Sequence, residues 1–322
     1  IRDSRMSFTH GYPFDPTYGH DLERLLAVAP PPEPADFADF WRARFARALA
    51  VDPNPRLHPS SLSHPRFSVF DLEYDSTDGF AIHGWLLTPQ HQPPRRGLLL
   101  GHGYGGIERP PLELPREDAA YLIPCFRGLS LSRRPPISED PNWHVLHDIH
   151  DRDRYILAGC VDDIWTGVSA LSRLCPELEG HIGYAGISFG GGLGAIALAW
   201  DARIGRGHLN VPTFGHQPLR LDLPTTGSGE AVRRFAREQG RMPDALNYLD
   251  AALAARHIRQ PIHIAAARFD PVVPPPGQFA IHNAIPGDRR LLVLEAGHCD
   301  HPRRVPQERE LMSQLWAFFG PL

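Results

Sequence analysis

Residues 183–196 read GYAGISFGGGLGAI and place a single serine, Ser188, among six glycines. Glycine at this density indicates a backbone that turns sharply or that another segment approaches very closely. The stretch 186–190, Gly-Ile-Ser-Phe-Gly, has the spacing of a nucleophile elbow, a strained strand-to-helix turn that lifts a serine hydroxyl into a pocket. The pattern therefore predicts a strand before Ser188 and a helix directly after it.

The rest of the chain alternates short apolar runs with helical patterns. Strand-like runs lie at 96–106, 119–128, 181–187, 206–212, 261–270 and 289–298, and helical patterns lie at 160–174, 191–200, 277–285 and 307–319. Two further strand-like segments, 66–76 and 79–89, flank an Asp78-Gly79 hairpin signal. The alternation predicts an α/β fold with a mostly parallel central sheet and helices on both faces.

We expect residues 1–322 to form one domain. About the first 65 residues are proline-rich with helical patches at 21–28 and 36–49, which predicts an N-terminal helical extension. The stretch 214–258 is polar and then helical, and it is a candidate insertion over the edge of the sheet. Residues Ile1 to Arg5 precede Met6, which we expect to be the natural start.

A serine at an elbow is inert unless a base removes its proton and a carboxylate orients that base. Asp270 and His298 each end an apolar run, and both follow Ser188 in the order Ser, acid, His that such enzymes use. The sequence therefore predicts a catalytic triad of these three residues. His301 is the alternative base, and Ser188 could instead be only a small residue at a tight turn.

Acyl transfer also needs hydrogen-bond donors for the developing oxyanion. The glycine-rich run HGYGG at 102–106 follows a predicted central strand, so the backbone N–H groups of Tyr104 and Phe189 are the expected donors. His102 is expected to be structural. The glycines at 190–195 also match a dinucleotide fingerprint, but the match lies mid-chain and no carboxylate follows at the required distance.

Charge and cysteine content narrow the possible partners. The net charge is −4, all 33 basic residues are arginine, and no basic block stands out, so we expect no nucleic acid partner. The four cysteines are irregularly spaced, which fits a reducing, cytoplasmic location and no metal site. No apolar run approaches the length of a membrane span and no leader is visible, so no membrane association is expected. No cofactor is expected.

These segments together resemble the acetyl xylan esterase and cephalosporin-C deacetylase family of the α/β-hydrolases. The similarity covers most of the chain, from PADFADFWRARFARAL through GHGYGG and the elbow to NYLDAALAARHIRQPIHIAAARFDPVVPPPGQFAIHNAI. Three positions depart from the family: Leu129 replaces the glutamine of Arg-Gly-Gln, Phe189 replaces the glutamine after the nucleophile, and Cys299 replaces a glutamate after the histidine. These changes predict less polar surroundings for the site.

The resemblance implies a serine carboxylester hydrolase that removes short acyl groups, acetyl above all, from a sugar or other small alcohol. It also implies a homo-oligomer, a ring-shaped hexamer. Two alternatives stay open at this point. An acyltransferase would use the same triad and pass the acyl group to an alcohol or thiol, and a non-catalytic binding protein of the same fold usually lacks a member of the triad.

Overall fold

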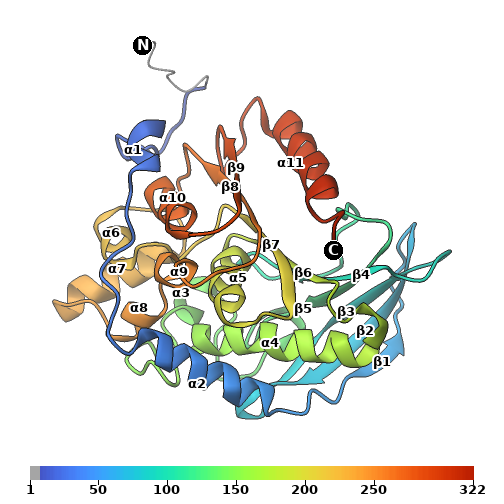
Figure 1. Cartoon of the computed structure of the whole chain (residues 1–322). Helices are drawn as coiled ribbons and strands as arrows, with labels where there is room; N and C mark the ends of the chain where they lie inside the picture. The colour runs from blue at the N-terminus through green and yellow to red at the C-terminus, as the bar shows by residue number, and fades with distance from the viewer. Residues whose placement is uncertain (1–7) are drawn as a thin grey trace.

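A twisted sheet runs through the centre of the computed structural model, which describes residues 8–322 (Figure 1). Within these residues its nine strands lie in the order β1-β2-β3-β5-β4-β6-β7-β8-β9. The strands are β1 Arg56–Pro59, β2 Phe67–Asp75, β3 Ala81–Pro89, β4 Arg96–Gly101, β5 Ala119–Pro124, β6 Ile182–Ile187, β7 Ile204–Asn210, β8 Ile262–Ala267 and β9 Arg289–Leu294. The expected start at Met6, with Ile1 to Arg5, lies outside the described residues.

Strand direction divides the sheet in two. The pairs β1–β2, β2–β3 and β3–β5 are antiparallel, whereas β4–β5, β4–β6, β6–β7, β7–β8 and β8–β9 are parallel. The predicted hairpin is confirmed: Asp78 and Gly79 join β2 to β3, and both have positive φ, 59° and 66°. Two consecutive positive φ values match the twist of the flanking strands, which explains the Asp-Gly pair.

Helices cover both faces of the sheet, as the alternation of segments predicts (Figure 1). The helices of residues 8–322 are α1 Leu22–Leu26, α2 Phe37–Leu49, α3 Pro141–His144, α4 Ile156–Leu174, α5 Phe189–Trp200, α6 Gln217–Asp222, α7 Ser228–Gln239, α8 Ala245–Tyr248, α9 Ala251–Ala255, α10 Pro275–Ala284 and α11 Arg304–Phe318. Neighbouring side chains of β4 point to opposite faces. Leu99 joins the core formed with α2, α4 and α5, whereas Leu98 joins a second core with Phe318 of α11.

The N-terminal region contains helices α1 and α2 where the sequence pattern places helical patches, and also a short strand that the pattern did not indicate. Residues 56–59 form β1, which pairs with β2 at the edge of the sheet in the register Leu57↔Leu72. Four residues are too few for an alternating pattern to stand out from a loop, so β1 gives no readable signal. Helix α2 does form, and Trp41 anchors it by donating a hydrogen bond of 3.0 Å to the carbonyl of Tyr248.

The stretch 214–258 folds into the four short helices α6 to α9 at one end of the sheet (Figure 1). Helix α9 packs against α5 and α10, and α7 packs against α3. The stretch therefore lies beside the helix that follows Ser188.

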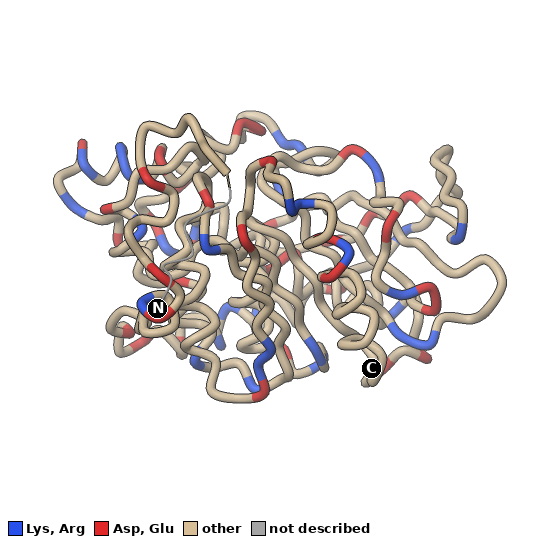
Figure 2. The backbone as a smooth tube through the Cα atoms, turned by 90° about the horizontal axis from the view of Figure 1, so that it is seen from above, with Lys and Arg blue, Asp and Glu red and all other residues tan. Residues whose placement is uncertain are grey.

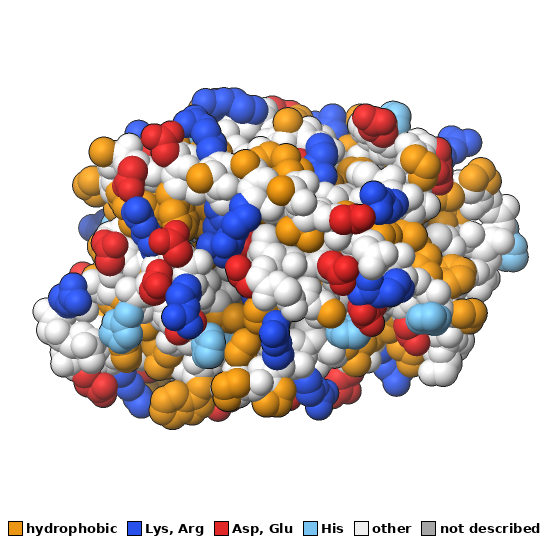
Figure 3. Space-filling model, turned by 90° about the horizontal axis from the view of Figure 1, so that it is seen from below, with side chains coloured by type: hydrophobic (Ala, Val, Ile, Leu, Met, Phe, Trp, Pro, Cys, Tyr) orange, Lys and Arg blue, Asp and Glu red, His pale blue; other side chains and the backbone are white. Residues whose placement is uncertain are grey.

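Charged residues of both signs are spread along the described part of the chain trace rather than gathered in one block (Figure 2). On the face seen from below, basic and acidic groups are interspersed with apolar ones (Figure 3). In the described part of the chain, no helix has the length and apolar character needed to cross a membrane. Within residues 8–322, no three or more His, Cys, Asp or Glu side chains are grouped as metal ligands would be.

Candidate active site

Ser188 occupies a sharp turn between β6 and α5. Its φ of 53° and ψ of −109° form a strained conformation for a residue with a side chain. The turn requires its flanking glycines: a Cβ on Gly186 would lie 2.4 Å from the carbonyl oxygen of Gly190. A Cβ on Gly190 would lie 2.4 Å from the carbonyl carbon of Gly101, at the end of β4. The glycine spacing thus reflects close packing of backbone around the serine.

The three side chains that the sequence singled out lie within hydrogen-bond distance of one another. His298 Nε2 lies 2.8 Å from Ser188 Oγ, and His298 Nδ1 lies 2.7 Å from Asp270 Oδ2. Asp270 follows β8 and His298 follows β9, so the carboxyl ends of neighbouring parallel strands bring them together. His301, the alternative base, is buried with its ring 5.8 Å from that of Phe8.

The Asp270 carboxylate is fully buried and held by four hydrogen bonds. Oδ1 accepts bonds of 2.9 Å from the backbone N–H groups of Val272 and Val273. Oδ2 accepts a bond of 3.0 Å from the amide of Gln278, in addition to its contact with His298. Sequence reasoning missed Gln278, although an amide in the apolar stretch that follows the acid is a readable signal.

Two opposing effects act on the pKa of His298. Burial lowers it, because the charged imidazolium loses water, but the Asp270 carboxylate and its hydrogen bond outweigh burial. The net result is a pKa raised above the ordinary value for histidine. The side chain of His298 is still 19% exposed, so the imidazole can meet a molecule arriving from solvent.

The loop after β4 places Tyr104 against Phe189. Their rings stack with centroids 4.0 Å apart, and Phe214 meets Phe189 edge-on at 5.9 Å. Among the described residues, the backbone hydrogen bonds outside helices and strands include none donated by the N–H of Tyr104 or Phe189. Neither N–H group is therefore committed to a backbone acceptor among these bonds.

A buried histidine that the sequence analysis overlooked fixes the Tyr104 ring. His144 Nε2 lies 3.0 Å from the carbonyl oxygen of Arg127, so Nε2 carries the proton and donates. His144 Nδ1 is then the acceptor for the Tyr104 hydroxyl at 2.8 Å. Burial lowers the pKa of His144 to about 4, which keeps the imidazole neutral. The sequence does not single out His144, because the chain contains 18 histidines and no motif surrounds this one.

His102 has the structural position expected of it. Its Nε2 accepts a hydrogen bond of 3.1 Å from the N–H of Phe126, so Nδ1 donates to the carbonyl of Gly103 at 2.7 Å. Burial lowers the pKa of His102 to about 4. The neutral ring thereby ties the loop after β4 to the end of β5.

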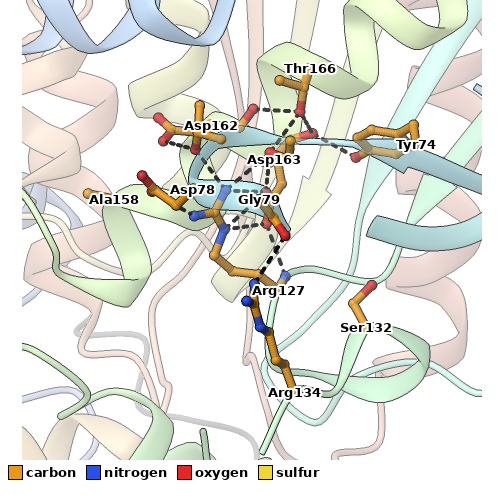
Figure 4. Close-up of polar contacts among 12 residues, drawn as sticks. Tyr74, Asp78, Gly79, Arg127, Ser132, Arg134, Ala158, Asp162, Asp163 and Thr166 are labelled. Carbon is orange, nitrogen blue, oxygen red and sulfur yellow. Dashed lines mark hydrogen bonds and ion pairs between the residues drawn. The ribbon is translucent and has the colours of Figure 1, made fainter. Parts of the chain in front are cut away.

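A buried cluster of charges anchors Arg127, which follows β5 (Figure 4). Its guanidinium donates to Asp163 of α4 at 2.7 Å and to the hydroxyls of Ser76 and Thr77 at 3.1 and 3.0 Å. Asp163 is fully buried and Arg127 is 2% exposed. The cluster fixes the backbone carbonyl that holds His144.

Besides Phe189, two positions depart from the residues usual in the family that the sequence resembles, Leu129 and Cys299. Leu129 is buried in the main core, 1% exposed. Cys299 is partly exposed next to His298, and burial together with the nearby Asp270 and Asp300 raises the pKa of its thiol to about 11. A thiol with this pKa is protonated at neutral pH.

The described part of the N-terminal segment packs against the loop that carries Asp270. The backbone N–H of Asp270 donates to the carbonyl of Pro16 at 3.1 Å. The rings of Phe8 and Tyr12 lie 5.1 and 6.1 Å from that of Phe269. This segment thus contributes to one side of the site, which the sequence pattern did not indicate.

Comparison with known proteins identifies the family. The model of the acetyl xylan esterase (AXE1) family matches residues 22–313. Acetyl esterase Axe7A of Xylanibacter ruminicola is 21% identical over 307 residues, which cover 90% of this chain and 69% of that protein.

Solved structures agree on the fold. An acetyl xylan esterase from Paenibacillus sp. R4 is 22% identical with a TM-score of 0.74, covering 93% of this chain and 100% of its own. Acetyl xylan esterase 1 from Thermoanaerobacterium sp. JW/SL YS485 is 20% identical with a TM-score of 0.75, covering 94% and 99%. The predicted α/β-hydrolase fold is confirmed, and the chain belongs to the acetyl xylan esterase family of carboxylester hydrolases.

Proposed function

We propose that this chain is a serine esterase that removes short acyl groups, acetyl above all, from a sugar or other small alcohol through an acyl-enzyme. The observation that carries the proposal is the continuous set of hydrogen bonds from Ser188 Oγ through His298 to Asp270, at 2.8 and 2.7 Å. Family membership supports the ester-hydrolysing reaction and the acetyl group.

In the proposed mechanism, the Ser188 hydroxyl attacks the ester carbonyl while His298 Nε2 takes its proton. Asp270 holds the imidazole with Nδ1–H toward the carboxylate and stabilises the imidazolium. The N–H groups of Tyr104 and Phe189 donate to the oxyanion of the tetrahedral intermediate. His298 then protonates the leaving alcohol, and a water activated by the same base hydrolyses the acyl-enzyme.

The aromatic wall beside the nucleophile supports a short acyl group. Tyr104 stacks on Phe189 with ring centroids 4.0 Å apart, and Phe214 meets the Phe189 ring edge-on at 5.9 Å. A longer neutral chain would have to displace these rings or remain in water, which forfeits about 0.8 kcal/mol for each methylene left unburied. Leu129 and Phe189 are both buried apolar side chains, which fits less polar surroundings for the site.

The test of the nucleophile is Ser188→Ala. We expect loss of nearly all hydrolysis of 4-nitrophenyl acetate with an unchanged far-ultraviolet circular dichroism spectrum, and a serine-directed phosphonate should label Ser188 in the parent protein. Ser169→Ala on α4 is the matched control and should retain activity. Labelling of another serine, or full activity in Ser188→Ala, would overturn the assignment.

An acyltransferase remains the second candidate, since the same triad serves it. The two differ in the fate of the acyl group, so the ratio of acyl transfer to hydrolysis in the presence of an added sugar or thiol acceptor separates them. We expect hydrolysis to exceed transfer. A non-catalytic binding role would require Ser188→Ala to leave every measured property unchanged.

Further proposals concern the domain organisation, the assembly and the location of the protein. We propose that residues 1–322 form one domain, with the N-terminal region packed on it and 214–258 as an insertion near the site. A homo-oligomer, a hexamer by family resemblance, and a cytoplasmic location complete the proposal. Light scattering on a gel-filtration column tests the assembly, since a monomeric mass contradicts it.

A further inference from the structure

A cavity of about 420 Å³ lies beside the catalytic base. His298 and Ile187, the residue before Ser188, form part of its wall, and His298 Nε2 lies 2.8 Å from Ser188 Oγ. The volume falls in the range of roughly 300–1,000 Å³ that is usual for small-molecule sites. The cavity is therefore adjacent to the nucleophile and large enough for part of a substrate.

The walls of this cavity come from the carboxyl ends of the parallel strands and from α11. The loop after β9 contributes residues 296–301, and β6 and β7 contribute Ile187 and Asn210 at their ends. The lining residues of α11 lie three and four positions apart and therefore share one face of the helix: Arg304, Gln307, Glu308 and Leu311.

Gln307 ties α11 to the segment that carries the catalytic base. Its side-chain oxygen accepts a hydrogen bond of 2.8 Å from Glu295 N, and its side-chain nitrogen donates to the carbonyl of Ala296 at 3.0 Å. Ala296 precedes His298 by two residues. Because these bonds join the two main walls, the cavity is formed before any substrate arrives.

The proposed reaction directs the alcohol part of the ester toward this cavity. His298 Nε2 has to return its proton to the oxygen of the leaving alcohol, so that oxygen lies beside the imidazole. The acyl group meets a different wall, since Tyr104, Phe189 and Phe214 are not lining residues of the cavity. The alcohol therefore extends into the space that His298 lines.

The lining combines apolar and polar side chains. Val211, Leu294 and Leu311 contribute hydrocarbon surface, whereas Gln307 and Asn210 contribute amides. A sugar ring has the same two characters, because C–H groups cover its faces and hydroxyls surround its edge. A purely apolar chain would leave the amides unpaired, so the lining suits a sugar ring better.

The charged groups of the cavity leave one negative charge in excess. Arg304 Nε donates to Glu308 at 2.9 Å, and Arg304 Nη1 lies 3.8 Å from the Asp300 carboxylate, so one guanidinium faces two carboxylates. The Cys299 thiol, which also lines the cavity, is affected in the same sense. Burial, and then the carboxylates of Asp270 and Asp300, raise its pKa to about 11. An anion is therefore disfavoured in this cavity.

We propose that this cavity is the subsite for the alcohol part of the ester, and that it favours a neutral alcohol of sugar size over an anionic one. The proposal rests on the function proposed above. Arg304 and Glu308 are 56% and 58% exposed, so water and salt weaken their effect. Each of these charges should change the selectivity by only about threefold.

The first arm of the test compares two acetate esters of nearly equal size. Methyl 3-O-acetyl-β-D-glucopyranoside is neutral, and the corresponding glucuronide carries a carboxylate in place of its CH₂OH group. We expect Glu308→Gln to lower the neutral-to-anionic ratio of kcat/KM about threefold and Arg304→Gln to raise it about threefold. Comparison with the parent protein cancels the intrinsic reactivity of the two esters.

The second arm tests the space itself. Glu308→Trp places a large ring at the edge of the cavity. We expect kcat/KM for the neutral sugar ester to fall at least about tenfold relative to that for ethyl acetate, whose alcohol is too short to fill the cavity.

Glu310 supplies the matched control for both arms. It lies on α11 as Glu308 does, but it is exposed and is not a lining residue of the cavity. Glu310→Gln and Glu310→Trp remove the same charge and add the same ring as the Glu308 variants. Both should keep the selectivity ratios of the parent protein.

Failure of the subsite and failure of the proposed function give different results. If the parent protein hydrolyses these esters and either Glu308 variant keeps the ratio of the parent, the subsite is wrong and the proposed function stands. If the parent hydrolyses none of them and no 4-nitrophenyl acetate, the proposed function is wrong. Calorimetric titration with methyl β-D-glucopyranoside then tests the cavity without turnover. Binding that Glu308→Trp removes supports the subsite, and absent or unchanged binding overturns it.

Discussion

Gln278 offers a quantitative test of how the site holds its acid. Its fully buried side chain makes three hydrogen bonds: it accepts from Ala267 N at 2.8 Å and donates to Val273 O at 2.8 Å and to Asp270 Oδ2 at 3.0 Å. At about 1 kcal/mol for each bond, Gln278→Leu should lower the free energy of unfolding by about 3 kcal/mol.

The same substitution should slow catalysis by a separate route. Asp270 keeps three of its four hydrogen bonds but loses the one that fixes Oδ2, the oxygen that faces His298. Loosening this geometry should lower kcat for 4-nitrophenyl acetate by about tenfold to a hundredfold, with KM nearly unchanged, because positioning acts on the reacting groups and not on substrate binding.

Gln260→Leu is the matched control. Gln260 also makes three hydrogen bonds, to the carbonyls of Leu198 and Asp201 at 3.0 Å each and from Arg259 N at 3.1 Å, but none reaches the site. Urea unfolding followed by circular dichroism gives the stability of both variants, and initial rates give kcat and KM. Equal kcat losses in the two variants would refute the positioning role and leave Gln278 as a structural residue.

Three further predictions concern the base, its protonation and the acyl length. His298→Ala should abolish turnover and His301→Ala should matter far less; the reverse order would make His301 the base. The base acts only when neutral, so kcat/KM should rise as the pH passes through the raised pKa of His298. Asp270→Asn should move this rise in the pH profile to lower pH, because burial alone then acts on the pKa of His298 and lowers it. A rise that moves to higher pH in this variant contradicts the reasoning. Across 4-nitrophenyl esters, kcat/KM should peak at acetyl or propionyl and fall at least about tenfold at octanoyl, roughly 1.4 kcal/mol, whereas a steady rise would indicate a lipase-like tunnel.

The sequence predicts those parts of the molecule that depend on local pattern. The elbow is readable because backbone contacts around Ser188 exclude any side chain at Gly186 and Gly190. Asp270 and His298 are readable because each ends an apolar run, and parallel strands bring their ends to one edge of the sheet.

The parts that the sequence did not predict depend on tertiary contacts. His144 reaches Tyr104 across 40 residues of chain, and nothing near either residue indicates the pairing. Gln278 acquires its importance only from what surrounds it after folding, since its partners lie on β8 and on the loop that carries Asp270. The short edge strand at 56–59 forms because β2 provides a partner, not because of its own composition.

The buried charges around Arg127 have a consequence for the order in which the molecule assembles. Arg44 comes from α2, Thr77 from the β2–β3 turn, Arg127 from the end of β5 and Asp163 from α4. Each of these groups loses its water only when partners from distant segments arrive, because a solitary buried charge is too costly. We therefore expect the cluster to close late, after the apolar surfaces have met, so substitutions in it should accelerate unfolding more than they slow folding.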